Sequence, residues 1–576
     1  MKHYFKNYNI GSFNFFYNLL LLSLFLVTSA YNGIYFVFVW ELMSLTSFFL
    51  IIFEWQHRDT IRAGLIYFIM THIATAFVLA AFLMINQSIG SFDFGIIKSS
   101  AQSLSLTLQT IVVVCMLIGF GTKAGIIPVH IWLPRAHSAA PSHISALMSG
   151  VIIKMGIFMM IRMFFDILPF TPVWLGPVIL LLGAVSSVLG VLYALTEHDL
   201  KRLLAYHSIE NVGIILIGLG SSLFFIQTNN PGLAIMAAGA GFFHTLNHAV
   251  FKSLLFLGAG SIINQTHTRN IEEYGGLIKT MPLTAFFFLI GSIAISGLPP
   301  FNGFVSEWLT FQSLFSGIAT QGLVTKSMFI GVTFALALTG GLAAACFVKA
   351  FGITFLARPR SVEAEKAKES SYYLTLSMGF LALLCLLFGI FGGNIISIIQ
   401  QVVTSLSIFG SGTSALSSVG YSLVVSGGIA VLNIPLLIMA ALFAAVITVG
   451  FTNWLSRNQK SVRSIIWDCG FNDLTPRMEI TATAFSRSLI LIFKSILRPA
   501  KFQHIEYLNN KKGYFVTNNT INLSIQNLYE SYFYRPTAGV FNVLSLQIRR
   551  FQSGNINQYL LYLFILLVIL LVFAKF

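Results

Sequence analysis

Long apolar stretches without charged residues recur along most of this 576-residue chain, and short polar segments separate them. Each stretch is about 20 residues long, the length of a helix that crosses a bilayer. Backbone groups in lipid must form hydrogen bonds within their own segment, and no alternating ten-residue pattern indicates a barrel, so the pattern predicts helices. We therefore expect an all-α integral membrane protein with about 14 transmembrane helices. The predicted spans are near 12–29, 33–54, 63–87, 104–127, 144–165, 173–196, 203–225, 232–262, 282–298, 302–317, 327–356, 372–393, 430–453 and 558–576, with a further short helix in the Ser- and Gly-rich region 394–429.

Two of the apolar regions are interrupted by prolines and glycines. Region 104–143 is twice as long as one span, and region 282–317 is broken by Pro299 and Pro300. Irregular backbone at membrane depth is tolerated only where it lines a cavity, and its occurrence in both halves of a transporter indicates the binding site. The interruptions therefore predict two inverted repeats, each with a broken helix.

The positions of the spans divide the chain into six parts. The segment 479–501 has apolar residues on one face and basic residues on the other, which predicts an amphipathic helix on the membrane surface or against a partner. An ordinary surface helix of a small cytoplasmic domain is the alternative. The predicted parts are N-terminal spans (1–62), a first half-channel repeat with its broken helix near 120–143 (63–200), a second with its broken helix near 297–307 (201–357), additional spans (358–453), a basic cytoplasmic segment (454–557) and a final span (558–576).

Composition agrees with a membrane protein and argues against several other functions. The chain is 56% hydrophobic and only 9% charged, whereas a soluble domain has roughly 25% charged residues. Its net charge of +15 fits a basic excess beside spans, which marks the cytoplasmic side and attracts anionic lipid rather than nucleic acid. The four cysteines form no CxxC, so iron–sulfur and structural zinc sites are not supported. No glycine-rich phosphate loop follows a strand, which argues against a nucleotide site.

Ionisable residues inside the apolar spans are the candidate functional groups. A charged side chain at mid-bilayer costs roughly 2.5–3.5 kcal/mol on insertion scales, so such groups must face one another, water or the interior of the bundle. By default they mark an ion or proton pathway. The candidates are Glu41, Lys123, Lys154, Lys201, His244, His248, Lys252, Glu307 and Lys349.

Several of these candidates have a structural alternative. Glu41 and Lys349 could lie at the ends of spans and extend to the membrane surface. His244 and His248 share a helix face, and either could be an ordinary buried histidine; zinc binding lacks a third ligand. Lys201 lies in "TEHDLKRLLAY", which is either a solvated turn or a kink that joins two half-channels. A polar stripe that lines a water path is the interpretation we favour.

Lys123 illustrates how such a pathway could work without a cofactor. The glycines of "GFGTKAG" allow water and neighbouring helices to approach the lysine closely. A carboxylate that moves towards or away from a buried lysine changes the affinity of that lysine for a proton. Movement of Glu41 relative to Lys123 would therefore make the lysine take up or release a proton.

These residues lie in motifs that resemble a known family, the antiporter-like membrane subunits of respiratory complex I, multisubunit cation/proton antiporters and membrane-bound nickel–iron hydrogenases. The motifs are "VWELMS", "GTKAGIIPVHIWLP", "DLKRLLAY", "NHAVFKSLLFL" and "NGFVSEW". The resemblance implies a proton path through Glu41, Lys123, Lys154, Lys201, Lys252 and Glu307. The stretches "LYALTEHDLKRLLAYHSIENVGIILIGLG" and "WDCGFNDLTPRMEITATAF" look most like the formate hydrogenlyase and hydrogenase-4-type branch.

The resemblance also implies partners and a location. It implies other membrane subunits and a peripheral hydrogenase module, whose nickel–iron and iron–sulfur centres lie outside this chain, in a bacterial cytoplasmic membrane. The chain would then be a non-redox, ion-translocating subunit without a catalytic centre of its own. Family members have about three more helices before the span with Glu41 than the single one here. We expect that the start is assigned late, the gene is truncated, or another polypeptide supplies those helices.

Three functions follow as hypotheses. The first is proton translocation within a hydrogenase or formate hydrogenlyase-type complex. The second is a subunit of a Na⁺/H⁺ antiporter or an inorganic-carbon uptake system, although the few oxygen atoms at mid-membrane favour protons. The third is a membrane anchor whose charges only hold helices together, which explains two or three buried charges better than a line of six with two broken helices.

Overall fold

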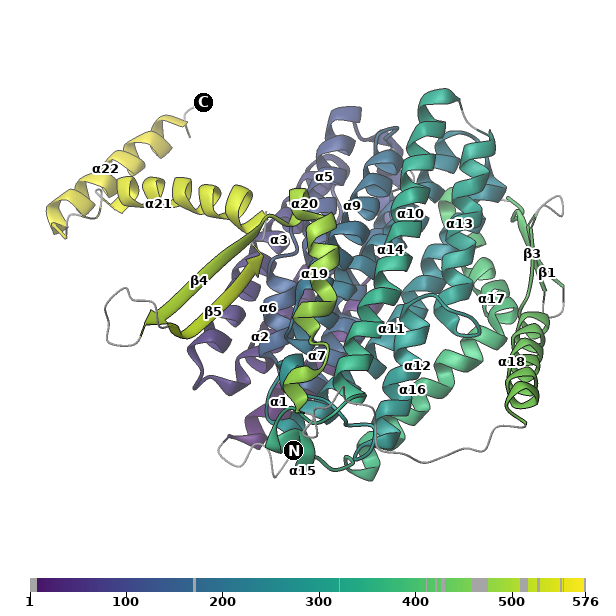
Figure 1. The fold of residues 1–576 in the computed structure, drawn as a ribbon. Helices are drawn as coiled ribbons and strands as arrows, with labels where there is room; N and C mark the ends of the chain where they lie inside the picture. The colour runs from purple at the N-terminus through teal and green to yellow at the C-terminus, as the bar shows by residue number, and fades with distance from the viewer. Residues whose placement is uncertain are drawn as a thin grey trace. The chain divides into compact units, whose positions relative to one another are not determined.

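The computed structural model confirms a helical membrane protein. Among the described residues, 11 helices are long and apolar enough to cross a membrane. Contacts divide the chain into two units, Met1–Leu489 and Ile490–Phe576, which we describe separately (Figure 1). The structure describes residues 8–168, 172–320, 322–410, 412–419, 422–425, 430–457, 475–507, 516–525, 529–549, 552 and 554–573.

The first unit is a bundle of helices in which both predicted interruptions are present. One break separates α5 from α6, and the other separates α12 from α13. The helices up to α9 are α1 (Ile10–Ser29), α2 (Gly33–Ile51), α3 (Arg58–Ile89), α4 (Phe94–Ser100), α5 (Leu106–Ala124), α6 (Trp132–Ala139), α7 (Ser142–Leu147), α8 (Ile153–Ile161) and α9 (Leu175–Thr196). Those that follow are α10 (Leu200–Gln227), α11 (Pro231–Thr266), α12 (Pro282–Ile295), α13 (Asn302–Thr320), α14 (Leu323–Phe355), α15 (Val362–Lys366), α16 (Tyr372–Ile390), α17 (Gly392–Thr404), α18 (Ile434–Ser456) and α19 (Ala482–Ile492).

Of the candidate spans in the part of the chain that the structure describes, α10 is the most enclosed, and it packs against α9, α11, α13, α14 and α6. Its side chains are buried from Leu203 to Phe225. Asp199 caps its N-terminus by accepting hydrogen bonds from the backbone amides of Lys201 and Arg202. Because α10 is surrounded by both repeats, groups on it can contact both (Figure 1).

The region after α16 contains structure that the hydrophobic pattern did not predict. The expected short helix is present as α17, but it is followed by an antiparallel sheet with strand order β1–β2–β3. The strands are β1 (Leu416–Val419), β2 (Ser422–Val425) and β3 (Val431–Asn433). The inner face of the sheet packs Leu423 and other apolar side chains against α11, α13 and α17, so burial on a helical neighbour stabilises strands that are only three or four residues long.

The predicted amphipathic helix over 479–501 is wrong in its length. Helix α19 ends at Ile492, and a short α20 (Lys494–Leu497) follows it. Arg498 then adopts the left-handed conformation with φ 43°, and Pro499 begins a strand. Proline disfavours helical backbone at the residue before it, which explains why the helix stops.

In the described part of the second unit, a hairpin and two longer helices follow α20. Strands β4 (Pro499–Tyr507) and β5 (Val516–Ile525) are antiparallel, and α21 (Arg535–Arg549) and α22 (Ile556–Phe573) follow them. The apolar α22 covers most of the span predicted over 558–576.

Candidate ion-translocation site

Lys123 occupies the last turn of α5, directly before the first break, and its side chain is buried. Its ammonium donates hydrogen bonds to the hydroxyls of Ser44 on α2, at 3.0 Å, and Tyr67 on α3, at 2.9 Å. The nitrogen also lies 5.2 Å from the centre of the Tyr67 ring and 5.7 Å from that of Trp40. The lysine is therefore held by neutral groups and aromatic faces.

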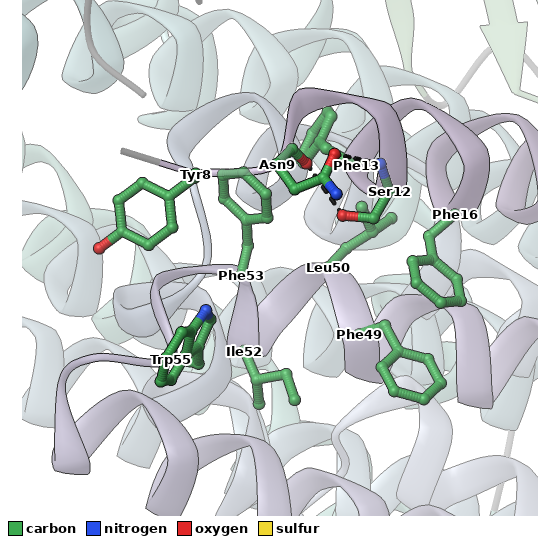
Figure 2. A pocket seen from close by; sticks show the side chains of 10 residues that line it. All are labelled: Tyr8, Asn9, Ser12, Phe13, Phe16, Phe49, Leu50, Ile52, Phe53 and Trp55. Carbon is green, nitrogen blue, oxygen red and sulfur yellow. Dashed lines mark hydrogen bonds between the residues drawn. The ribbon is translucent and has the colours of Figure 1, made fainter. Parts of the chain in front are cut away.

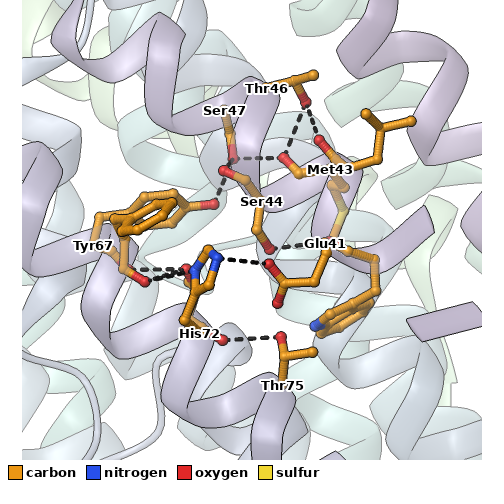
Figure 3. A network of polar contacts seen from close by, with 12 residues as sticks. Glu41, Met43, Ser44, Thr46, Ser47, Tyr67, His72 and Thr75 are labelled. Atoms are coloured by element: carbon orange, nitrogen blue, oxygen red, sulfur yellow. Dashed lines mark hydrogen bonds and ion pairs between the residues drawn. The ribbon is translucent and has the colours of Figure 1, made fainter. Parts of the chain in front are cut away.

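Glu41 does not bond directly to Lys123, although the two groups interact electrostatically. Its carboxylate pairs instead with His72 of α3, at 3.1 Å (Figure 3). The side chains of Glu41 and His72 are 28% and 43% exposed, so this pair lies at the edge of the unit. Figure 3 shows the pair beside Ser44 and Tyr67, the two residues whose hydroxyls accept from Lys123.

The first break leaves backbone groups that tertiary contacts then satisfy. Gly125, with φ 81°, ends α5, and glycine adopts this conformation without a steric penalty. The indole of Trp132 donates to the carbonyl of Thr122 at 2.7 Å, and the amide of Ile127 donates to Ser186 at 3.2 Å. The interruption at Lys123 is thus a packed feature.

Two central lysines follow the first break. Lys154 is buried and donates to the carbonyl of Ser149, which lies in a π-helical turn over Met148–Ile152. π-Helical turns are frequent at functional sites because they displace carbonyls from the regular helical pattern. Lys201 is only 3% exposed and donates to the carbonyl of Ala140, so it does not lie in a solvated turn.

His248 lies between the lysines of the two repeats. It is fully buried and interacts electrostatically with Lys154 and Lys252. Neither of its ring nitrogens has a hydrogen-bond partner among the described residues. A neutral imidazole carries one donor and one acceptor that both need partners, so this position favours a hydrated passage between the repeats.

His244 has partners on two other helices. Its ring nitrogens contact the hydroxyl of Ser306 on α13 at 2.9 Å and the amide oxygen of Asn211 on α10 at 3.2 Å. This corresponds to the alternative of a satisfied buried histidine, with side-chain rather than backbone partners. Among the described residues, no three His, Cys, Asp or Glu side chains form a group that could hold a metal ion.

The second break positions Glu307. Gly297, with φ 62°, follows α12, and a Cβ atom there would lie 2.4 Å from the Glu307 carboxylate. The missing side chain at the break therefore makes the space for the acid. Lys252 of α11 is fully buried, donates to the carbonyl of Leu204 on α10 and lies 5.5 Å from the ring centre of Phe256.

Lys349 has a different environment from the other lysines. It is buried rather than extended to the surface, and it donates to the carbonyls of Leu195 at 2.7 Å and Glu197 at 2.8 Å. These carbonyls end α9, where a positive charge is favourable. The geometry is that of a helix C-terminal cap, so the predicted role of Lys349 in transport has less support than that of Lys252.

Sequence reasoning missed several groups that contact the predicted ones. Tyr67 and His72 lie on α3 next to Lys123 and Glu41, and His207 and Glu210 lie in the middle of α10. Glu210 could have been found, because it is a carboxylate within an otherwise apolar span. A tyrosine in an aromatic-rich helix gives no such signal.

A separate cavity of about 200 Å³ lies between the start of α1 and the end of α2 (Figure 2). It is lined mainly by apolar and aromatic side chains, among them Phe13, Phe53 and Trp55. None of the predicted site residues lines it.

Comparison with known proteins identifies the family. Residues 30–333 match the family described as NADH:quinone oxidoreductase/Mrp antiporter, TM. The chain belongs to this family. It is 37% identical to hydrogenase-4 component B of Escherichia coli, over 98% of this chain and 83% of that protein. It is 33% identical to formate hydrogenlyase subunit 3 of Escherichia coli, over 84% of this chain and 75% of that protein.

Solved structures show the same antiporter-family fold. An archaeal membrane-bound sulfane sulfur reductase has a chain with a TM-score of 0.72 and 24% identity, which covers 96% of this chain and 83% of its own length. Respiratory complex I from Thermus thermophilus has one with a TM-score of 0.52 and 22% identity, which covers 67% of this chain and 79% of its own length. The resemblance drawn from the motifs is therefore confirmed.

Proposed function

We propose that this chain is the proton-translocating membrane subunit of a hydrogenase or formate hydrogenlyase-type complex in a bacterial cytoplasmic membrane. Protons move along Glu41, Lys123, Lys154, Lys201, Lys252 and Glu307, with His248 between the repeats. One observation carries this proposal: the buried lysines at and between the two helix breaks are held by hydroxyl and carbonyl oxygens. Relatives named as hydrogenase and formate hydrogenlyase components support the type of complex.

The way these lysines are held also argues against a purely structural anchor. Charges that only hold helices together must be paired, because an unpaired buried charge destabilises the fold. Among the described residues, Lys123, Lys154, Lys201 and Lys252 form no ion pair within 4.0 Å of a carboxylate. An amine that is not fixed in an ion pair is able to release its proton and take it up again, which transport requires.

Redox energy must reach this line of groups from partner subunits. We place nickel–iron and iron–sulfur centres in a peripheral module, and no step proposed for this chain runs through them. A charge displaced at one end of the line changes the proton affinity of the next group, because Coulomb interactions are strong in a low-dielectric interior. The transported protons therefore move in response to chemistry that occurs elsewhere.

A cation antiporter remains the second candidate, because the chain is 32% identical to a probable K⁺/H⁺ antiporter component of Rhizobium meliloti over 69% of this chain and 37% of that protein. The ammonium of Lys123 already occupies the hydroxyl oxygens of Ser44 and Tyr67. A metal cation at the same oxygens would meet a like charge. This geometry favours protons as the transported ion.

The test is proton uptake by inverted vesicles that contain the assembled complex. Lys123→Ala and Glu307→Ala are expected to abolish uptake while the partner subunits still co-purify. Lys98→Ala is the matched control, because Lys98 is a half-exposed lysine paired with Asp166 at 2.6 Å and lies outside the proposed line. Unchanged uptake in either path variant contradicts the proposal, and uptake that requires sodium supports the antiporter.

A further inference from the structure

Two titratable side chains in the middle of α10 have no role in the path described so far. His207 and Glu210 are 0% and 1% exposed. They are three residues apart and therefore share one helix face, and the His207 Nδ1 atom contacts the Glu210 carboxylate directly. A buried acid at mid-span is costly and by default functional.

Side chains from three other helices surround this pair. On the side of α14, His207 interacts electrostatically with Cys346, and its ring centre lies 4.6 Å from that of Phe347. On the other side, Glu210 interacts electrostatically with Lys252 of α11 and with Glu307 of α13. The pair therefore lies between the second-half lysine and the acid at the second break.

Backbone packing keeps Glu210 in this position. A Cβ atom at Gly190 of α9 would lie 2.7 Å from the backbone nitrogen of Glu210 and 3.1 Å from its Cβ. The two helices thus approach as closely as their backbones permit. This contact leaves α10 little freedom to rotate, so backbone packing against α9 fixes the place of Glu210.

Taken by themselves, Lys252, Glu210 and Glu307 are one proton short of neutrality; Lys154 and His137 also act on Lys252, and Lys154 is bonded to the Ser149 carbonyl outside this group. With Lys252 protonated and both Glu210 and Glu307 ionised, the net charge is +1 − 1 − 1 = −1. Lys349 also faces His207, but it lies at the carbonyl end of α9 beside Glu197. His244 faces α10 through Asn211 and has neutral partners. A net charge in a dry interior is expensive, so one further proton is held among the two acids and His207.

We propose that the His207–Glu210 pair is a proton-holding site that connects Lys252 to Glu307; this deepens the proposed function and rests on it. In the forward step Glu307 first releases the shared proton from the cluster and becomes a carboxylate. The Lys252 ammonium then gives a proton to Glu210, which leaves a neutral amine and a neutral acid. Glu210 then gives the proton to ionised Glu307 and becomes a carboxylate again. Lys252 regains a proton from the side of His248 and Lys154, so charge and protons balance over the cycle.

The first measurement is transport. Glu210→Gln keeps the shape of the side chain but has no group that titrates, and it is expected to slow proton uptake by on the order of 100-fold, the effect of losing a positioned proton-transfer group. The control is Ser222→Ala on the same helix, whose hydroxyl only donates to the carbonyl of Ala234 at 2.8 Å. Uptake at the normal rate in Glu210→Gln overturns the inference.

The second measurement separates a proton carrier from a passive counter-ion. Infrared difference spectra of the purified complex at two pH values report protonated carboxyl groups. If Glu210 and Glu307 share one proton, the band of the protonated carboxyl group disappears in Glu210→Gln and also in Glu307→Gln. Either substitution removes one negative charge, so the cluster is neutral without the shared proton. A band that persists in Glu210→Gln overturns the inference.

A third variant covers the case in which Glu210→Gln does not assemble. Glu210→Asp retains a carboxyl group with a shorter side chain, and the band is expected to shift in frequency because the shared proton resides partly on residue 210. An unshifted band assigns the proton to Glu307 alone and overturns the inference. The same assay distinguishes failure of the proposed function from failure of this inference. If the proposed function is wrong, Lys123→Ala leaves proton uptake intact. If Lys123→Ala loses uptake while Glu210→Gln keeps the normal rate, only the role of the His207–Glu210 pair is wrong.

Discussion

Each of the two repeats contains a broken helix, but the two breaks have different neighbours. At the first break, Lys123 is bound by the hydroxyls of Ser44 and Tyr67, and its acid, Glu41, lies at the edge of the unit with His72. At the second break the acid itself, Glu307, occupies the space over a glycine and is buried.

A break therefore supplies a place for a charged group but does not determine whether that charge is positive or negative. Backbone groups freed at a break can stabilise either charge, and small residues let the side chain approach them. The neighbouring helices then decide which charge is compatible. Neutral hydroxyls on α2 and α3 suit an ammonium, whereas the acid at the second break interacts with Glu210, which in turn interacts with Lys252. The first half can exchange protons through Glu41, and the second through a closed cluster.

The largest expected effect comes from filling the space at the second break. A Cβ atom at Gly297 would lie 2.4 Å from the Glu307 carboxylate, whereas one at Gly125 would lie 2.3 Å from the flexible side chain of Leu133. Both glycines have positive φ, so alanine at either costs about 1–2 kcal/mol of backbone strain. Gly297→Ala is expected to slow proton uptake about 100-fold, because displacing a reacting group by 1 Å has that effect.

Gly125→Ala is the matched variant and is expected to slow uptake by less than about tenfold, because Leu133 can change rotamer. Vesicle uptake, normalised to assembled complex, is the measurement for both. Equal losses of uptake in the two variants would show that backbone strain at the breaks, rather than the position of the Glu307 carboxylate, controls transport. The two breaks would then not differ in function.

The hydroxyls around Lys123 provide the next test. Tyr67→Phe removes one of the two hydrogen bonds to the ammonium, and a bond to a charged group contributes about 1.5–3 kcal/mol. We expect uptake to slow about tenfold or more. Tyr274→Phe is the control, because the Tyr274 hydroxyl is buried but donates to a loop carbonyl, that of Thr268, at 2.8 Å. Normal uptake in Tyr67→Phe would mean that the first half does not depend on neutral partners.

The partner of Glu41 is expected to matter less. The Glu41–His72 pair is partly exposed, and such pairs contribute about 0.2–1 kcal/mol. His72→Leu frees Glu41 to move towards Lys123 and is expected to change the uptake rate by at most about fivefold. His57→Leu, in the loop before α3, serves as the control. A complete loss of uptake in His72→Leu would place His72 on the path itself.

The span pattern and the breaks could be predicted from the sequence because both follow from elementary constraints. Apolar length sets a span, and proline with glycine interrupts one, as at Gly297 and Pro299. The charged candidates stood out against an apolar background for the same reason, and all the predicted lysines proved to be buried.

Partners across helices could not be predicted, because they depend on how the helices pack. Nothing in the spacing of α2 and α3 indicates that Glu41 meets His72 rather than Lys123. Lys349 was expected either on the ion path or at the membrane surface, yet it is buried and caps α9. The strands β1–β3 were missed because they are short and depend on helices α11 and α17 for burial, and α19 was extended too far because its apolar face continues beyond Phe493.

The smallest expected effect concerns the segment 479–489, which in the first unit docks on the loop between the two repeats. His198 contacts the hydroxyl of Thr483 at 2.9 Å, and Glu272 accepts from the Thr483 amide at 2.8 Å. Burial lowers the pKa of His198 below its ordinary value, and the charge of Lys349 lowers it further. The folded form therefore prefers the neutral imidazole.

The stabilisation from neutral His198 is present above the ordinary histidine pKa of about 6.5 and is lost as the pH falls through the lowered folded-state value. Hydrogen exchange of backbone amides in 479–489 is thus expected to rise modestly between pH 8 and pH 5, after correction for intrinsic exchange. His198→Gln, which cannot become charged, is expected to remove this pH dependence while the docking contacts of Glu272 remain. If hydrogen exchange in 479–489 rises equally in His198→Gln, groups other than His198 cause the pH dependence. The loop between the repeats would then have no pH-sensitive contact with this segment through His198.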